Sequence, residues 1–183
     1  ADYHEMWKSL GMDLETHDQL CEVLPGMFGQ VYLSQENRPE GMDYYNFVIA
    51  EIHGVRPAEL IEHQKKGGKV FGTFCVYVPD EIVFAADAIA TGLCGGSQFW
   101  VPGGEKVLPA NTCPLIKASV GARLDRTCPF FRIADMFIGE TTCDGKKKAW
   151  EILAKDVPLH VMDLPQMKRA KDIKAWAEEI ETF

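Results

Sequence analysis

The pattern of hydrophobic and polar positions changes after residue 66. Up to that point, apolar residues recur at helical spacing among charged ones, which predicts helices over residues 1–24 and 43–66. Residues 25–42 contain three glycines and two prolines, a composition typical of irregular chain. The sequence therefore predicts a helical N-terminal segment over residues 1–66.

Beyond residue 66, short apolar runs alternate with helical patterns. Strands are expected over residues 69–74, 92–101, 134–138 and 159–164. Helices are expected over residues 79–90, 113–124, 142–154 and 166–182. Strand–helix units in succession are typical of a parallel sheet with helices on both faces. We therefore predict an α/β domain over residues 67–183, with a parallel four-stranded sheet and flanking helices, Rossmann- or flavodoxin-like in its layout.

Composition narrows the class of protein. The 183 residues are 46% hydrophobic, enough for a substantial core, and their net charge of −8 argues against a nucleic-acid groove. No apolar run approaches the about 20 residues of a membrane span, and the polar start shows no secretory signal. We therefore expect a cytoplasmic protein with no nucleic-acid or membrane partner, in which cysteines stay reduced.

Cysteines are the main candidates for chemistry, at Cys21, Cys75, Cys94, Cys113, Cys128 and Cys143. Cys75 follows the first predicted strand, while Cys113 and Cys143 begin helices that follow strands. Ligands of open α/β sheets bind at the carboxyl ends of strands, and a helix N-terminus favours the thiolate that binds metals. These three thiols are therefore expected to converge on one crevice.

The remaining cysteines leave alternatives open. Cys94 lies in the second predicted strand and Cys128 in a loop. The successive spacings from Cys75 onward are 19, 19, 15 and 15 residues, unlike the close cysteine pairs of structural zinc sites. Such spacing favours an iron–sulfur cluster held between loops. Burial as a small core residue is the alternative, above all for Cys21 in the helical segment.

Other polar residues add less. His4, His17 and His63 lie in predicted helices and are expected to be solvated or hydrogen-bonded. His53 lies near a helix break, and His160 is expected in the core. The stretch from Gly139 to Lys148 has the glycines and lysines of a phosphate loop but not their spacing, so no P-loop is predicted. Its three consecutive lysines are either solvated or attract an anion. Glu140 places a carboxylate near Cys143.

Four stretches resemble a known family: FGTFCVYVPDEIVFAADA (Phe71–Ala88), LPANTCPLIKASVGA (Leu108–Ala122), GETTCDGKKKAWEIL (Gly139–Leu153) and VMDLPQMK (Val161–Lys168). In their order and cysteine-bearing motifs they are similar to the D-component family of 2-hydroxyacyl-CoA dehydratases and benzoyl-CoA reductases, over roughly residues 65–170. Cys94 in GLCGG and Cys128 in RTCPFF resemble the double-cubane cluster protein branch of that family.

The resemblance implies an iron–sulfur protein. It carries either one 4Fe–4S cluster on three cysteines, which leaves one iron open, or a double-cubane 8Fe–9S cluster that needs about twice as many thiolates. The ligand candidates are then Cys75, Cys94, Cys113, Cys128 and Cys143. The resemblance also implies a homo- or heterodimer and subunits of two α/β domains. This chain is therefore expected to be the N-terminal half of a longer subunit.

The sequence leaves three hypotheses for the function of this protein. The leading hypothesis is the iron–sulfur catalytic component of an ATP-dependent low-potential reductase system of anaerobic metabolism. A separate ATP-hydrolysing iron–sulfur activator would supply its electrons for reducing a small molecule, which agrees with the lack of a P-loop here. The first alternative is a 2-hydroxyacyl-CoA dehydratase subunit, a lyase component with one 4Fe–4S cluster. The second alternative is a non-catalytic module that is stabilised by zinc or binds another protein.

Overall fold

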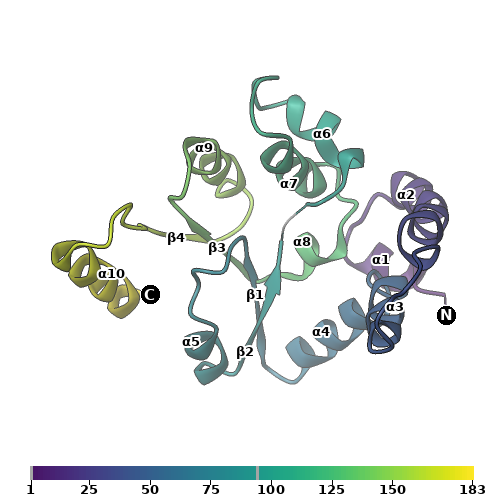
Figure 1. Cartoon of the computed structure of the whole chain (residues 1–183), viewed down its shortest axis with the longest axis horizontal. Coiled ribbons are helices and arrows are strands. Elements are labelled where there is room, and N and C mark those ends of the chain that lie inside the picture. Colours follow the sequence, from purple (N-terminus) through teal and green to yellow (C-terminus); the bar gives the residue numbers. More distant parts are fainter. Residues whose placement is uncertain (1, 94) are drawn as a thin grey trace.

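A computed structural model describes residues 2–93 and 95–183, and it confirms the expected α/β class. The strands of its sheet are β1 (Lys69–Thr73), β2 (Ala88–Gly92), β3 (Met136–Glu140) and β4 (Leu159–Met162). They pair in the order β2–β1–β3–β4, and every pair is parallel (Figure 1). The carboxyl ends of all four strands therefore lie along one edge of the sheet.

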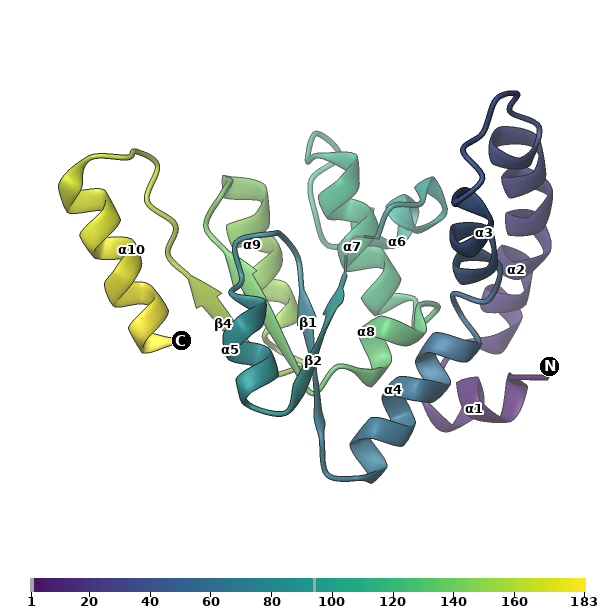
Figure 2. The same cartoon turned by 60° about the horizontal axis from the view of Figure 1, so that its bottom comes forward.

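Helices flank this sheet and, with turns between them, make up the N-terminal segment. Before the sheet come α1 (His4–Ser9), α2 (Leu14–Phe28), the π-helix η1 (Gly29–Leu33), α3 (Met42–Ala50) and α4 (Val55–Lys65). Later helices are α5 (Asp80–Ala85), the 3₁₀-helix η2 (Gln98–Trp100), α6 (Val101–Glu105), α7 (Pro114–Leu124), α8 (Pro129–Ile133), α9 (Asp144–Leu153) and α10 (Ala170–Thr182). The N-terminal helices and α10 lie on opposite sides of the molecule (Figures 1 and 2).

The core has a layer on each face of the sheet because neighbouring residues of β3 point in opposite directions. Phe137 packs in the cluster that contains Trp150 of α9 and residues of α7. Ile138 packs on the other face, in the cluster that Val83 of α5 and Trp176 of α10 complete. Phe137 and Ile138 are both fully buried. Burial on both faces explains why β3 has a continuous apolar run instead of alternation.

The helical segment is attached to the sheet through α4. Leu60 is fully buried against Val70 of β1 and Ile133 of α8. The side-chain amide of Gln64 donates hydrogen bonds at 2.9 Å to the Ile133 carbonyl and to the Asp135 carboxylate. The same carboxylate oxygen accepts from the backbone N–H of Val70 at 2.8 Å. These contacts join α4, β1 and the entry to β3.

The second predicted strand was misplaced. β2 occupies residues 88–92, within and just after the helix expected over residues 79–90, and residues 98–105 form η2 and α6 instead of a strand. A Cβ built on Gly104 would lie 2.0 Å from the Lys117 carbonyl oxygen, and one on Gly121 1.9 Å from that of Trp100. The glycines therefore allow α6 and η2 to approach α7 at backbone distance. This tertiary contact overrides the strand propensity of the FWV run.

Residues 25–42 are also more helical than expected, since α2 runs through Pro25 to Phe28 and continues as the π-helix η1. Leu24 and Phe28, one helical turn apart, both line a cavity against the rest of the molecule. Leu24 also packs against the hydrophobic core, so α2 is anchored just before the stretch whose composition predicts irregular chain.

Candidate functional site at the carboxyl end of the sheet

Two of the predicted cysteines follow neighbouring strands. Cys75 comes shortly after β1 ends at Thr73, and Cys143 shortly after β3 ends at Glu140. Because β1 and β3 pair in parallel, both cysteines lie at the carboxyl edge of the sheet, where open α/β sheets bind ligands. Cys75 is half-buried and Cys143 is exposed.

Cys113 and Cys143 are the N-cap residues of α7 and α9, two helices that pack against each other. A Cβ built on Gly145 would lie 2.7 Å from Ile116 Cδ1, 3.8 Å from Thr112 Cγ2 and 4.0 Å from the Sγ atom of Cys143. Cys143 therefore lies beside the residues that flank Cys113. Both helix N-termini carry partial positive charge, which favours anionic sulfur at these two positions.

A buried ion pair fixes the loop that leads to Cys143. The carboxylate of Glu140 is buried, and its Oε1 atom accepts a hydrogen bond from Thr142 Oγ1 at 2.8 Å and pairs with the Lys146 ammonium. The backbone N–H of Lys146 also donates to the Cys143 sulfur at 3.5 Å. On the other side, Trp150 Nε1 donates to the Glu140 carbonyl at 2.8 Å. The loop is therefore held at both ends before it reaches the thiol.

The run of three lysines serves two purposes. Lys147 lies 3.4 Å from the Asp144 carboxylate and Lys148 2.5 Å from that of Glu151, both as partly exposed pairs within α9. These contacts agree with the solvated-face alternative for Lys147 and Lys148. Lys146 differs, because it compensates the buried carboxylate at the end of β3.

Of the other two cluster candidates, only Cys128 lies within the described residues. Cys128 is the buried N-cap residue of α8 and follows the carboxyl end of α7, whose 11 residues extend roughly 16 Å from Cys113 at the amino end. Cys94 lies outside the described residues. Its chain neighbours Leu93 and Gly95 line the same cavity as Cys128. The length of α7 thus separates Cys128 from Cys113.

That cavity has a volume of about 1040 Å³ and lies between the N-terminal helices and the η2–α8 side of the molecule. Apolar side chains dominate its lining, among them Leu20, Leu24, Phe28, Phe47, Trp100 and Phe131. Its size is that of pockets for small organic ligands. Its polar lining residues include Cys21 and His53, neither of which was a favoured site residue from sequence.

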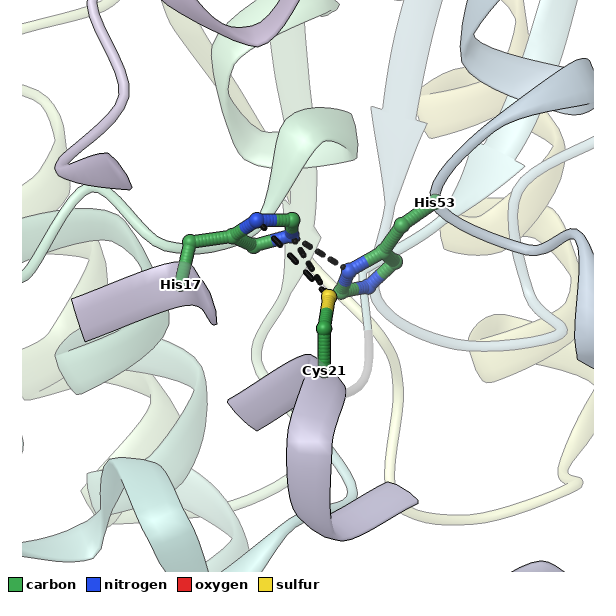
Figure 3. A group of neighbouring side chains, drawn as sticks. All are labelled: His17, Cys21 and His53. Atoms are coloured by element: carbon green, nitrogen blue, oxygen red, sulfur yellow. Dashed lines mark hydrogen bonds between the residues drawn. The ribbon is translucent and has the colours of Figure 1, made fainter. Parts of the chain in front are cut away.

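One group of side chains among residues 2–93 and 95–183 brings three ligand atoms suited to a mononuclear metal within 4.8 Å of one another: His17, Cys21 and His53 (Figure 3). Burial lowers the pKa of His53 to about 4 and also lowers the pKa of His17, so both imidazoles are neutral near pH 7. Burial raises the pKa of the Cys21 thiol. Sequence reasoning missed this group, although His17 and Cys21 have the i, i+4 spacing of one helix face.

The parallel sheet, with cysteines after its strands, defines an α/β domain with a thiol-rich carboxyl edge. Comparison with known families is specific: the family described as "2-hydroxyglutaryl-CoA dehydratase, D-component" matches residues 75–183, more than half of the chain. The chain belongs to this family.

A similar protein is the "Putative dehydratase subunit YjiM" of Escherichia coli (strain K12). It is 41% identical over 122 residues, which cover 66% of this chain and 32% of the relative. The chain thus spans about a third of the length of this curated relative. In the described part of the chain, no helix has the length and apolar character needed to cross a membrane.

Proposed function

We propose that this chain belongs to an iron–sulfur subunit that takes part in dehydrating a 2-hydroxyacyl-CoA thioester, with Cys75, Cys113 and Cys143 as cluster ligands. The observation that supports this proposal is that Cys75 and Cys143 follow neighbouring parallel strands, while Cys113 and Cys143 are the N-cap residues of two helices that pack against each other. Proteins of the matched family are generally iron–sulfur proteins, and the similar curated protein carries a dehydratase name. The dehydratase name of the similar protein is our reason for proposing this function first, although the sequence favoured the reductase.

The donor set fits such a cluster. Cysteine thiolates are its usual ligands, and the N-termini of α7 and α9 favour the anionic form of Cys113 and Cys143. When bound, the cluster would supply one-electron chemistry at low potential. The Lys146 N–H donates toward the Cys143 sulfur, a type of hydrogen bond that tunes the potential of a sulfur-ligated metal. The buried pair of Glu140 and Lys146 keeps that donor in place.

A second candidate function is the ATP-dependent low-potential reductase with a double-cubane cluster. The observation in its favour is that Leu93 and Gly95, which flank Cys94, share one cavity with Cys128. A larger cluster requires more thiolate ligands than the three cysteines of the first proposal. In that case the reaction would be reduction of a small molecule, and the dehydratase function would be wrong for this chain.

Both functions include the same partners. We propose a separate ATP-hydrolysing iron–sulfur activator, a homo- or heterodimer and a cytoplasmic setting that keeps the thiols reduced. We also propose that residues 1–66 and 67–183 are the helical segment and the first cluster-binding α/β domain of a longer two-domain subunit.

Iron and sulfide counts separate the two functions. The protein would be purified without oxygen, as the parent and as the Cys94→Ala, Cys128→Ala double variant. The dehydratase proposal expects about four irons per subunit in both, because neither cysteine is a ligand. A parent with about eight irons, falling in the double variant, would overturn it in favour of the reductase. Activity follows with a 2-hydroxyacyl-CoA, the activator and ATP: dehydration supports the first function, and its absence in an iron-loaded, activator-reduced sample contradicts it.

A further inference from the structure

His17, Cys21 and His53 form a compact group away from the carboxyl-edge cysteines. His17 and Cys21 project from the same face of α2, and His53 comes from the turn between α3 and α4 (Figure 3). His17 Nε2 lies 2.9 Å from His53 Nδ1 and 3.6 Å from the sulfur of Cys21. The two imidazole rings are stacked, with centroids 5.1 Å apart and an interplanar angle of 21°. The three donor atoms therefore lie within 4.8 Å of one another.

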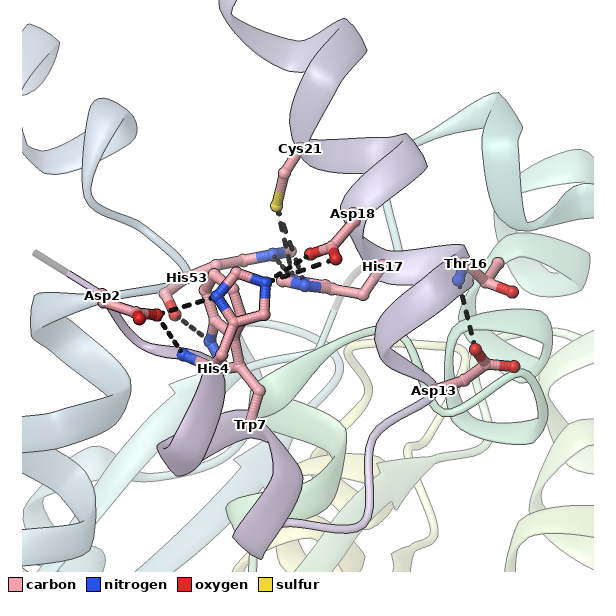
Figure 4. Close-up of polar contacts among 9 residues, drawn as sticks. All are labelled: Asp2, His4, Trp7, Asp13, Thr16, His17, Asp18, Cys21 and His53. Carbon is pink, nitrogen blue, oxygen red and sulfur yellow. Dashed lines mark hydrogen bonds and ion pairs between the residues drawn. The ribbon is translucent and has the colours of Figure 1, made fainter.

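The surrounding structure holds these side chains in place before any ligand binds. The ring of Trp7 packs edge-on against that of His17 at 4.3 Å, and its Nε1 donates to the His53 carbonyl at 2.7 Å (Figure 4). Asp13 caps the start of α2 by accepting from Thr16 N–H at 3.1 Å. His17 is fully buried. Metal sites require this kind of support from outside the ligand set.

Two of the donor spacings are close to those of a tetrahedral zinc site, and all three donor atoms lie within 4.8 Å of one another. With Zn–N near 2.0 Å and Zn–S near 2.3 Å, tetrahedral ligands lie about 3.3 Å apart for two nitrogens and about 3.5 Å apart for nitrogen and sulfur. The sulfur of Cys21 already has that distance from His17 Nε2. The two nitrogens of His17 and His53 have to separate by a few tenths of an ångström. Such a shift lies within ordinary side-chain motion.

We propose that His17, Cys21 and His53 bind a mononuclear zinc ion, with the fourth coordination position open toward the cavity. Cys21 and His53 both line that cavity. Three protein ligands and one open position are the arrangement of zinc sites that bind water or a small ligand, whereas structural sites have four protein ligands. A bound zinc would therefore give a polar, Lewis-acidic point to a cavity whose lining is otherwise mainly apolar. The site is independent of the iron–sulfur proposal.

Binding at this site has a definite proton balance. Both histidines bind a metal as neutral imidazoles, and the hydrogen that Nε2 of His17 and Nδ1 of His53 share moves to another ring nitrogen. The Cys21 thiol loses its proton to solvent as its sulfur binds zinc, so one proton is released per ion bound. A set of two imidazoles and one thiolate suits zinc, whereas magnesium and calcium prefer oxygen ligands.

Elemental analysis of the purified protein tests the site. We expect one zinc per chain in the parent after removal of loosely bound metal. His17→Gln, Cys21→Ser and His53→Gln should each weaken zinc binding by about tenfold or more, since even loss of an outer-shell partner costs about 10–100-fold. His63→Gln is the matched control, because His63 lies on α4 and is not part of the group. Equal zinc in the three variants and the control, or a parent that binds no zinc, would overturn the proposal.

Alkylation of the unmodified protein provides a test that does not depend on folding of the variants. Zinc should slow alkylation of Cys21 by about tenfold or more and leave that of Cys113 unchanged, as followed by peptide mass spectrometry. Cys143→Ser distinguishes the two metal proposals, since it should lose iron and keep zinc, while Cys21→Ser should do the reverse. Zinc-independent alkylation of Cys21, or iron and sulfide in place of zinc at this group, would refute the zinc site.

Discussion

Gly139→Ala tests whether close packing between β3 and α9 positions the loop of Cys143. A Cβ at residue 139 would lie 2.6 Å from Cε2 and 2.9 Å from Nε1 of the Trp150 ring. That ring is buried, and its Nε1 donates to the Glu140 carbonyl at 2.8 Å. The added methyl group must therefore displace the indole and stretch or break this hydrogen bond.

The expected magnitude follows from three contributions. Overpacking costs about 1–3 kcal/mol, and loss of the hydrogen bond costs about 1 kcal/mol. In the opposite direction, alanine in a strand is about 0.5–1 kcal/mol more favourable than glycine, because glycine loses more conformational entropy on folding. We expect Gly139→Ala to lower the free energy of unfolding by about 2 kcal/mol, measured by urea denaturation with circular dichroism.

Gly26→Ala is the matched control for this change. Gly26 lies in α2, and a Cβ built on it would have no heavy atom within 4 Å. This variant should be as stable as the parent or more stable by up to about 1 kcal/mol, because alanine is the better helix former. If Gly139→Ala also stayed within about 0.5 kcal/mol of the parent, Trp150 would not be fixed as described and the packing argument would be wrong.

Two further predictions concern charged groups. Lys146→Met should lower the free energy of unfolding by about 3–5 kcal/mol in urea denaturation, because it leaves the buried Glu140 carboxylate uncompensated. Lys147→Met, on the surface, should change that free energy by less than about 0.5 kcal/mol. Equal effects of the two substitutions would contradict the buried ion pair. Hydrogen bonds to Asp2 and Asp18 raise the pKa of His4 above its usual value. The stability that His4 contributes is therefore present below pH 6.5 and lost as the pH rises through the raised pKa, so the difference between the parent and His4→Gln should shrink from pH 6 to pH 9 in metal-free protein. If the difference in stability between the parent and His4→Gln grew from pH 6 to pH 9, the predicted direction of the pH dependence would be wrong.

Local patterns predicted the fold class because three of the four parallel strands, β1, β3 and β4, are short apolar runs. They failed at residues 92–105, where Gly104 and Gly121 allow backbone contact between helices that no local pattern encodes. The positions of Cys113 and Cys143 at helix N-termini could be predicted because each precedes a recognisable helix start. The approach of His53 to α2 could not, since it depends on the packing of residues far apart in sequence.

The central claim is that Cys75, Cys113 and Cys143 hold an iron–sulfur cluster. Its most direct test is the iron and acid-labile sulfide content of protein purified without oxygen, as the parent, Cys143→Ser and Cys21→Ser. The claim predicts a brown parent with iron and sulfide, the same content in Cys21→Ser, and loss of most of it in Cys143→Ser while circular dichroism stays unchanged. A colourless parent after anaerobic reconstitution with iron and sulfide, or equal iron in Cys143→Ser, would contradict it.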